Sequence, residues 1–365
     1  MSQIGFFSEA RDQSIVKRDI VTKYFKSWAQ IIKNRARKIN YIDLYCGQGI
    51  YNDGTESTPI LITKHCLSDT VLKDKIHMIL NDCNQTHLDI LRKSLSTIDN
   101  IKHLEERISI SQTKLTTENA SSFFDYPKYP CFSFIDPCGY AGVTKGLLKN
   151  LLSDWGSDCI MFFNYNEIKR FVTATNQKDN MIALFGEFIY QELVADLSKK
   201  VTPAKREKII LNKFIKSLSE FAKYILPFRF QKEQKNETSH YLIFLTKNIT
   251  GYKIMKDIMA KEGNKTAEGI PLFEFLPLNE TGNGQYNFVL NIDELKQSLL
   301  HTFHKRKLPV FKIILEHIYN TPYITNNYKE ALIQLEVEKK IIVIPYNKNR
   351  KPGTTMSEKN IIDFI

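Results

Sequence analysis

The sequence predicts an α/β protein with a doubly wound sheet, followed by a C-terminal winged helix-turn-helix domain. Residues 39–163 alternate short apolar runs with amphipathic stretches, the pattern of a parallel sheet covered by helices. Two further apolar runs, at 225–233 and 240–248, flank a polar turn and predict an antiparallel hairpin at the end of that sheet. Residues 308–351 then run helix, turn, helix, strand and basic loop, which is the order of a winged helix-turn-helix.

The expected parallel strands are short and rich in β-branched and aromatic residues, as strands buried on both faces are. We place them at 39–45, 76–82, 107–112, 131–136 and 158–164. The segments between them have helical character, and the clearest are 59–67, 84–95 and 144–155.

The chain divides into three parts on this interpretation. The first domain covers 1–262 and includes a helical insertion at about 166–222. A linker with a hairpin and a helix covers 263–304, because glycine and proline are densest between 263 and 285. The winged helix-turn-helix covers 305–365.

Composition narrows the class of protein. A hydrophobic content of 42% excludes wholesale disorder. The sequence has no uninterrupted run of 18 apolar residues, so it predicts no membrane span. The N-terminus has no apolar block typical of a signal peptide, so we expect a cytoplasmic protein. The six cysteines form no CxxC pair, which indicates reduced thiols and neither a zinc knuckle nor a disulfide framework.

A glycine-containing turn follows the first expected strand and is a candidate cofactor loop. Ligands of open α/β sheets bind at the carboxyl ends of strands, where glycines let the backbone approach closely. A third glycine would indicate a dinucleotide, but that position is Asn52, so NAD is disfavoured. Asp82 ends the second strand and either binds the hydroxyls of a ribose or caps the next helix. The candidate cofactor residues are Asp43, Tyr45, Gly47, Gly49, Asp82 and Asn119.

A second motif, Asp136-Pro137-Cys138-Gly139-Tyr140, follows the fourth strand. We assign catalysis to Asp136, Pro137 and Tyr140: the carboxylate would accept hydrogen bonds from an amino group, and the tyrosine would stack on a planar base. The alternative is a sharp turn at the end of the strand. Residues 164–166 (Asn-Tyr-Asn) face the same edge of the sheet, either toward the crevice or as a helix cap.

Both motifs carry a resemblance. Asp-Leu-Tyr-Cys-Gly-Gln-Gly (43–49) is similar to the first motif of class I S-adenosylmethionine-dependent methyltransferases that act on nucleic acids. Asp-Pro-Cys-Gly-Tyr (136–140) resembles their fourth motif, related to the Asp-Pro-Pro-Tyr of amino-methyltransferases. The resemblance implies a Rossmann-like methyltransferase sheet, S-adenosylmethionine as cofactor, and methylation of a base amino group.

The chain from about residue 15 to 260 also resembles the three-Cys-motif partner protein (TcmP) family. The matching segments are 23–28, 41–43, 57–59, 154–159, 163–166, 239–244 and 251–256. The resemblance implies that the chain works with a three-Cys-motif partner protein, whose cysteines give the family its name.

Cys138 departs from both patterns, since relatives tend to have an aromatic residue there and the amino-methyltransferase motif has no inserted Gly139. A thiolate beside a methyl donor could attack C6 of a pyrimidine, as in C5-methyltransferases. The alternative is a small buried residue, which we favour.

The basic charge is concentrated near the C-terminus. The net charge is +11, and residues 301–365 hold 11 Lys and Arg against 6 Asp and Glu. A winged helix-turn-helix places its second helix in the major groove and its wing on phosphates. The candidate nucleic-acid contacts are Asn326, Asn327 and Lys329 in that helix and Lys348, Arg350 and Lys351 in the wing. Docking of a protein, or use as a domain lid, is the alternative.

Two functions are consistent with these features. The first is S-adenosylmethionine-dependent methylation of a nucleic acid, more readily DNA than RNA. The second is a non-catalytic module that uses a methyltransferase-like fold to bind nucleic acid or recruit a partner. The sequence does not indicate an oligomeric state.

Overall fold

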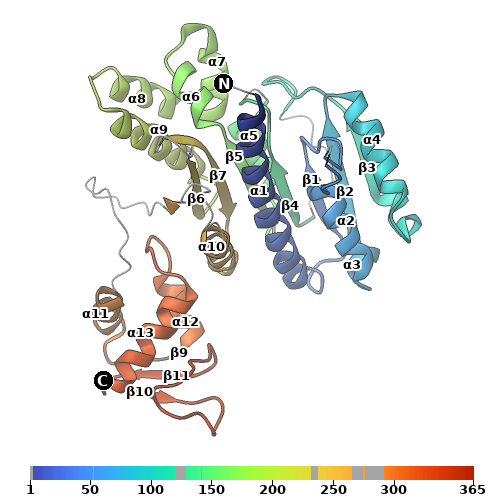
Figure 1. Ribbon diagram of the computed structural model, residues 1–365. Coiled ribbons are helices and arrows are strands. Elements are labelled where there is room, and N and C mark those ends of the chain that lie inside the picture. Colours follow the sequence, from blue (N-terminus) through green and yellow to red (C-terminus); the bar gives the residue numbers. More distant parts are fainter. Residues whose placement is uncertain are drawn as a thin grey trace. The chain divides into compact units, whose positions relative to one another are not determined.

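The computed structural model describes residues 3–51, 53–120, 129–140, 142–231, 237–264, 274–275 and 292–365. The chain forms two compact units, Met1–Glu274 and Phe275–Ile365 (Figure 1). Most of the expected linker, including its hairpin, lies outside the described residues. The helix expected at its end is α11 (Ile292–Phe303).

The first unit is built on one sheet with the strand order β3-β2-β1-β4-β5-β7-β6-β8. The first five strands in the sequence are parallel to one another, and β7 runs antiparallel between β5 and β6. The doubly wound fold is therefore confirmed. The strands are β1 (Ile39–Asp43), β2 (Ile76–Asp82), β3 (Ile108–Gln112), β4 (Cys131–Ile135), β5 (Asp158–Phe163), β6 (Tyr224–Gln231), β7 (Thr238–Thr246) and β8 (Glu274–Phe275).

The order of the strands fixes where a ligand can bind. From β1 the chain runs outward through β2 to β3, and it then returns to β4 on the other side of β1 before running outward to β5. Right-handed crossovers in opposite directions put the connecting helices on opposite faces, so a crevice opens between the carboxyl ends of β1 and β4. Every residue of β1 and β4 is buried, which holds both ends rigidly.

The helices of this unit follow the strands in the order that the periodicity predicts. Those between the strands are α2 (Thr58–Ser68), α3 (Leu72–Lys75), α4 (Gln85–Ser96) and α5 (Lys145–Leu151). The helical insertion consists of α6 (Tyr165–Phe171), α7 (Lys178–Phe185), α8 (Glu187–Leu197) and α9 (Pro203–Leu218), and α10 (Ile249–Asn264) follows β7. Short 3-10 turns cover Ile101–His103, Glu105–Arg107 and Thr175–Gln177.

A long N-terminal helix, α1 (Gln3–Ile32), was not expected from the sequence. It packs on α10, α2 and β4. Its buried Tyr24 donates a hydrogen bond to Asp158 Oδ2 (2.7 Å), and Trp28 Nε1 donates to the carbonyl oxygen of Gly156 (2.8 Å). A Cβ at Gly251 of α10 would lie 2.6 Å from the Tyr24 hydroxyl, so glycine permits the close helix contact.

These three contacts involve segments that carry the resemblance to three-Cys-motif partner proteins. Segments 23–28, 154–159 and 251–256 are far apart in the sequence but meet in this buried cluster. Burial raises the pKa of Asp158 to about 6, against the hydrogen bonds from Thr246 and Tyr24 that lower it. The cluster fastens α1 to the sheet, so those segments serve packing.

The second unit is a winged helix-turn-helix, as expected. Its elements are α11, β9 (Lys307–Pro309), α12 (Val310–His317), α13 (Thr325–Val337), β10 (Ile341–Ile344) and β11 (Ile361–Phe364). The three strands form an antiparallel sheet in the order β10-β11-β9. The apolar faces of the helices are fully buried at Leu299, Phe303, Ile313, Leu332 and Leu335. Residues 345–360 form the wing between β10 and β11.

None of the helices in the described ranges is both long enough and apolar enough to cross a membrane.

Candidate functional site

Three predicted acidic residues meet at one edge of the first sheet. Asp43 is the last residue of β1, Asp82 is the last of β2, and Asp136 directly follows β4. β1 pairs with both β2 and β4, so the three carboxyl ends are adjacent. Burial raises the pKa of Asp43, and the charges of Asp136 and Asp82 add to this effect.

Asp43 holds the 43–49 turn from its buried side. Its carboxyl group is 2% exposed and accepts hydrogen bonds from the Tyr41 hydroxyl (3.0 Å) and the backbone N–H of Tyr45 (3.3 Å). Burial raises its pKa to about 7, although both hydrogen bonds act in the opposite direction. Asp43 is thus placed to hold the backbone of the turn rather than to meet a ligand directly.

The two predicted glycines of the turn serve different purposes. Both have a left-handed backbone, with φ of 63° at Gly47 and 83° at Gly49. A Cβ at Gly49 would lie 2.7 Å from Leu91 Cδ1, so this glycine lets the turn pack on α4. A Cβ at Gly47 would have no atom within 4 Å and would project into open space. Gly47 therefore leaves room beside the turn for a ligand.

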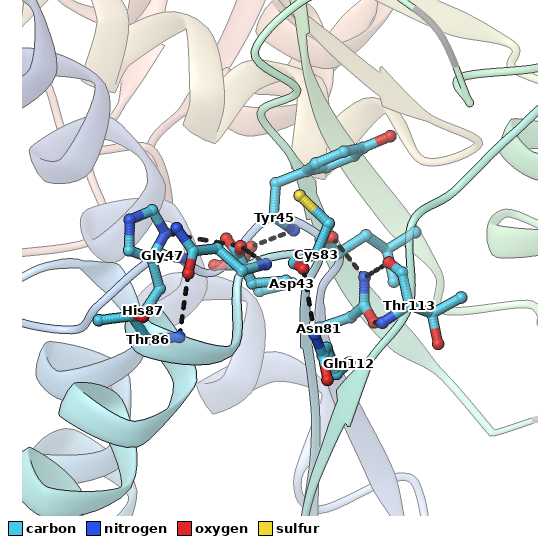
Figure 2. Close-up of polar contacts among 12 residues, drawn as sticks. Asp43, Tyr45, Gly47, Asn81, Cys83, Thr86, His87, Gln112 and Thr113 are labelled. Atoms are coloured by element: carbon cyan, nitrogen blue, oxygen red, sulfur yellow. Dashed lines mark hydrogen bonds and ion pairs between the residues drawn. The ribbon is translucent and has the colours of Figure 1, made fainter.

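Asp82 ties the turn to the second strand. Its Oδ2 accepts from the backbone N–H of Gly47 (3.1 Å), and its Oδ1 accepts from the N–H of Asn84 (2.8 Å) (Figure 2). Helix α4 is capped by Asn84, whose side chain accepts from Thr86 N–H (2.9 Å), so the capping role belongs to Asn84. A carboxylate has about four lone-pair sites, and Asp82 can therefore accept further hydrogen bonds.

Asn81 is a site residue that the sequence analysis missed. The side chain is buried and makes four hydrogen bonds of 3.0 Å: to the carbonyls of Leu44 and Thr113, and from the Ser111 hydroxyl and Thr113 N–H. Figure 2 shows it between the turn after β1 and the end of β3. The sequence could have indicated this role, because an asparagine inside a buried strand must find partners for every polar atom.

The other two candidate cofactor residues lie in different settings. Tyr45 is half-buried, and burial together with the nearby Cys138 and Cys83 raises its pKa. Asn119 closes its own loop after β3: its Oδ1 accepts from Thr116 N–H (2.8 Å) and its Nδ2 donates to the Lys114 carbonyl (3.0 Å).

Asp136 has a partner that the sequence did not suggest. The Nζ of Lys17, on α1, lies 2.7 Å from Asp136 Oδ2, and the side chains are 14% and 25% exposed. The same ammonium lies 4.5 Å from the centre of the Phe162 ring. The candidate acceptor site thus contains a cation as well as the expected carboxylate.

The rest of the fourth-strand motif is held by the helical insertion. The Tyr140 hydroxyl donates to Gln177 Oε1 (2.8 Å), and its ring lies 6.1 Å from that of Phe171. Pro137 is buried, and a Cβ at Gly139 would lie 3.0 Å from Glu167 Oε2. The chain bends at residues 138–140, as the alternative interpretation has it, and these contacts hold the tyrosine against the helical insertion.

Cys138 is exposed, so the interpretation as a small buried residue is wrong. Pro137 rather than Cys138 turns inward after β4. Partial burial and the neighbouring Asp136 and Asp82 charges raise the pKa of the thiol. A raised pKa keeps the thiol protonated at neutral pH, which disfavours the thiolate needed for attack on a pyrimidine.

Residues 164–166 divide between the two alternatives. Asn164 caps α6 by accepting from Glu167 N–H (3.3 Å), and the buried Tyr165 packs edge-on against Tyr241. Asn166 Oδ1 is buried and has no hydrogen-bond partner among the described residues.

The candidate nucleic-acid contacts also differ among themselves. Asn326 is exposed, whereas Asn327 Oδ1 accepts from Ile324 N–H (2.9 Å) at the start of α13. Lys329 pairs with Glu358 (3.6 Å). Lys348 and Lys351 are exposed on the wing, but Arg350 is buried in a bidentate ion pair with Glu336. These six residues therefore do not form one equally available surface.

Comparison with known proteins bears on both units. Residues 277–347 match the model of the GMT-like wHTH domain family. That match lies in the second unit, so membership of the three-Cys-motif partner family, which rests on residues 15–260, stays a prediction. No curated protein matches the chain.

Solved structures similar to this chain include several methyltransferases. A Legionella pneumophila protein of family DUF519 is 10% identical, with a TM-score of 0.41, over 71% of this chain and 95% of its own. A candidate rRNA methylase from Clostridium thermocellum is 12% identical (TM-score 0.31, 60% and 95%). A candidate methyltransferase from Streptococcus mutans, in complex with SAH, is 15% identical (TM-score 0.30, 60% and 94%).

Proposed function

We propose that the protein is an S-adenosylmethionine-dependent methyltransferase that acts on a nucleic acid. The observation that carries the proposal is the meeting of the 43–49 turn, Asp82 and Asp136 at the carboxyl ends of β1, β2 and β4. This is the switch point of a doubly wound sheet, where such folds bind their ligands.

The residues around the turn fit this cofactor. Gly47 leaves open space beside the backbone, and the lone pairs of Asp82 can accept from the two hydroxyls of a ribose. Asp43 and Asn81 hold the turn in place from the buried side. When bound, S-adenosylmethionine supplies an electrophilic methyl group.

The acceptor would lie beside Asp136. We infer that this carboxylate orients a base amino group and that Tyr140 flanks the base, with Pro137 fixing the backbone between them. Methyl transfer needs the nucleophile in line with the methyl group, so positioning supplies most of the rate enhancement. The acceptor must share Asp136 with Lys17 or displace it.

The winged helix supports a nucleic acid as the substrate, because this fold is a common reader of DNA. We therefore favour DNA over RNA. The resemblance over residues 15–260 adds a three-Cys-motif partner protein to the proposal.

A non-catalytic function is the second candidate, and two contacts favour it. Asp136 already has an ion-pair partner, and the Tyr140 hydroxyl is already bonded to Gln177. A module that only binds nucleic acid or recruits a partner would need neither group free. On this hypothesis, Asp136→Ala leaves the biological activity intact, whereas charge reversal in the wing destroys it.

Calorimetry tests the cofactor site. Titration of the full chain with S-adenosylmethionine should give a binding isotherm that Gly47→Asp abolishes, because the new side chain would fill the space beside the turn and bring a charge close to Asp82. Gly54→Asp is the matched control: Gly54 is in the same loop, has φ of 84° and no atom within 4 Å of a Cβ. Absence of heat with both the methyl donor and S-adenosylhomocysteine contradicts the enzyme proposal.

A further inference from the structure

The wing of the second unit is more basic than the helix that would enter a major groove. Helix α13 (residues 325–337) contains one lysine and two glutamates, and its Lys329 pairs with Glu358. The wing (residues 345–360) contains four basic residues and one glutamate. Since phosphate contacts supply most of the affinity for nucleic acids, α13 is poorly equipped to bind a duplex groove.

The wing is braced from inside. Arg350 Nη1 and Nη2 donate to the two carboxylate oxygens of Glu336 (2.8 and 2.6 Å), and Arg350 Nε donates to the carbonyl of Thr355 (2.7 Å). Gly353 N–H donates to Glu336 Oε2 as well (2.9 Å). Arg350 is thus used to fasten the wing to α13, so that Lys348 and Lys351 are held on a rigid loop.

Residues of the wing line an open pocket of about 530 Å³. Its lining is polar and basic apart from one aromatic ring, and consists of Tyr346, Asn347, Asn349, Arg350, Lys351, Thr354, Thr355, Ser357 and Asn360. Tyr346 is 68% exposed, although tyrosine rings usually bury much of their surface. The Nζ of Lys359 lies 4.7 Å from the centre of this ring.

An exposed aromatic ring among amides and lysines is the arrangement that single-strand binding proteins use. Bases stack on the ring, and cations follow the phosphates. Stacking of this kind requires a base whose face is uncovered, and inside a duplex each face is covered by the neighbouring base pair. Neither Lys348 nor Lys351 has an ion-pair partner within the described part of the chain, so both ammonium groups are available to phosphates.

We propose that the wing binds an unpaired nucleic-acid strand, with a base stacked on Tyr346 and the adjoining phosphates at Lys348 and Lys351. The proposal rests on the nucleic-acid substrate proposed above and names its form: a single strand, or an unpaired segment of a longer molecule. It also assigns a minor role to α13, including Asn326 and Asn327.

Fluorescence anisotropy with the full chain tests the stacking. The probes are labelled single strands of about 15 nucleotides, as DNA and as RNA, and the DNA duplex of the same sequence. The single strands should bind more tightly than the duplex. Tyr346→Ala should weaken single-strand binding at least about fivefold, whereas Tyr346→Phe, which keeps the ring, should bind like the wild type.

Charge reversal tests the phosphate contacts. Lys348→Glu with Lys351→Glu should weaken binding and reduce the slope of log K against log salt by about 1.4, or 0.7 for each lost single-strand contact. Lys312→Glu, which alters an exposed lysine of α12, is the matched control and should have little effect. Asn326→Ala tests α13 as the competing contact and should weaken binding less than Tyr346→Ala.

The proposal is overturned by equal or tighter binding of the duplex, or by single-strand binding that Tyr346→Ala does not weaken. A loss with Asn326→Ala that exceeds the loss with Tyr346→Ala also overturns it, because α13 would then be the reader. The same variants should bind S-adenosylmethionine like the wild type. Calorimetry therefore separates a failure of the wing proposal, with cofactor binding intact, from a failure of the proposed enzyme.

Discussion

Asp43 is a buried carboxyl group whose ionisation opposes folding. Its pKa rises from 3.8 to about 7, mainly through burial. The unfolded chain therefore loses this proton first as the pH rises, and the stability that the neutral group contributes is complete below about pH 4 and lost on the way to pH 7. In the native protein, the Asp43 carboxyl group therefore titrates near neutral pH.

The variant Asp43→Asn should remove this pH dependence. Urea unfolding at pH 4.5 and at pH 7.5 should show that the variant gains stability relative to the wild type as the pH rises, by about 4 kcal/mol at most. The change with pH is the diagnostic quantity, because asparagine cannot accept both hydrogen bonds that Asp43 accepts. A constant difference between the two proteins would contradict the raised pKa.

Lys17 is a positioning residue on this account, since it acts through Asp136. Lys17→Met should lower the rate of methyl transfer roughly tenfold or more, because Asp136 loses the partner that orients it. Affinity for S-adenosylmethionine should be unchanged. Lys33→Met is the control, because Lys33, which directly follows α1, is also in an ion pair, with Asp69.

Unchanged or faster methyl transfer by Lys17→Met would contradict this role. A faster rate would mean that the ion pair blocks Asp136 and that the acceptor must displace it. Kinetics at saturating cofactor, with calorimetry for the affinity, separates the two effects.

At the scale of elements, the wing depends on one ion pair. Arg350→Met would leave Glu336 buried without its cation, a change that costs about 3 kcal/mol for a buried pair. We expect hydrogen exchange to show lost protection in residues 345–360, including the Gly353 amide, which is bonded to Glu336.

Lys348→Met is the matched control for this element. The side chain of Lys348 is exposed, so its loss should change stability by less than about 0.5 kcal/mol. Equal protection in both variants would show that the wing does not need the Arg350–Glu336 pair.

Elements with strong periodicity could be predicted from the sequence, and those fixed by distant contacts could not. β2 has the bounds that the sequence predicts, 76–82, because a strand buried on both faces is rich in apolar residues. The buried residues Val16, Ile20, Tyr24 and Trp28 of α1 recur at helical spacing, so this helix could have been predicted. Its contacts with α10, α2 and β4 could not. Because the position of α1 could not be predicted, Lys17 could not be assigned to the site from the sequence.

The same distinction applies within the site. The turn at 43–49, Asp82 and Asp136 were predicted because each ends a strand, and strand ends share one edge of a parallel sheet. The partners of Asp136 and Tyr140 come from α1 and from the helical insertion, 119 and 37 residues away in the sequence. Long-range pairs of this kind leave no local pattern.

At the scale of the whole molecule, the basic residues behind the net charge of +11 have two different roles. Part of the basic excess is structural: Arg350 braces the wing, Lys17 pairs with Asp136, and Lys329 pairs with Glu358. The remainder includes exposed lysines on the wing. The molecule thus combines a unit with a candidate methyl-donor site and a unit with a candidate strand-binding surface.

Mass spectrometry of nucleosides tests the central claim most directly. DNA and RNA, single-stranded and duplex, would be incubated with S-adenosylmethionine and the full chain, alone and with a three-Cys-motif partner protein, and then digested. The wild type should yield a base one methyl group heavier, and Asp136→Ala should yield none. Cofactor binding without methylation of any of these substrates would contradict the central claim and favour the non-catalytic function.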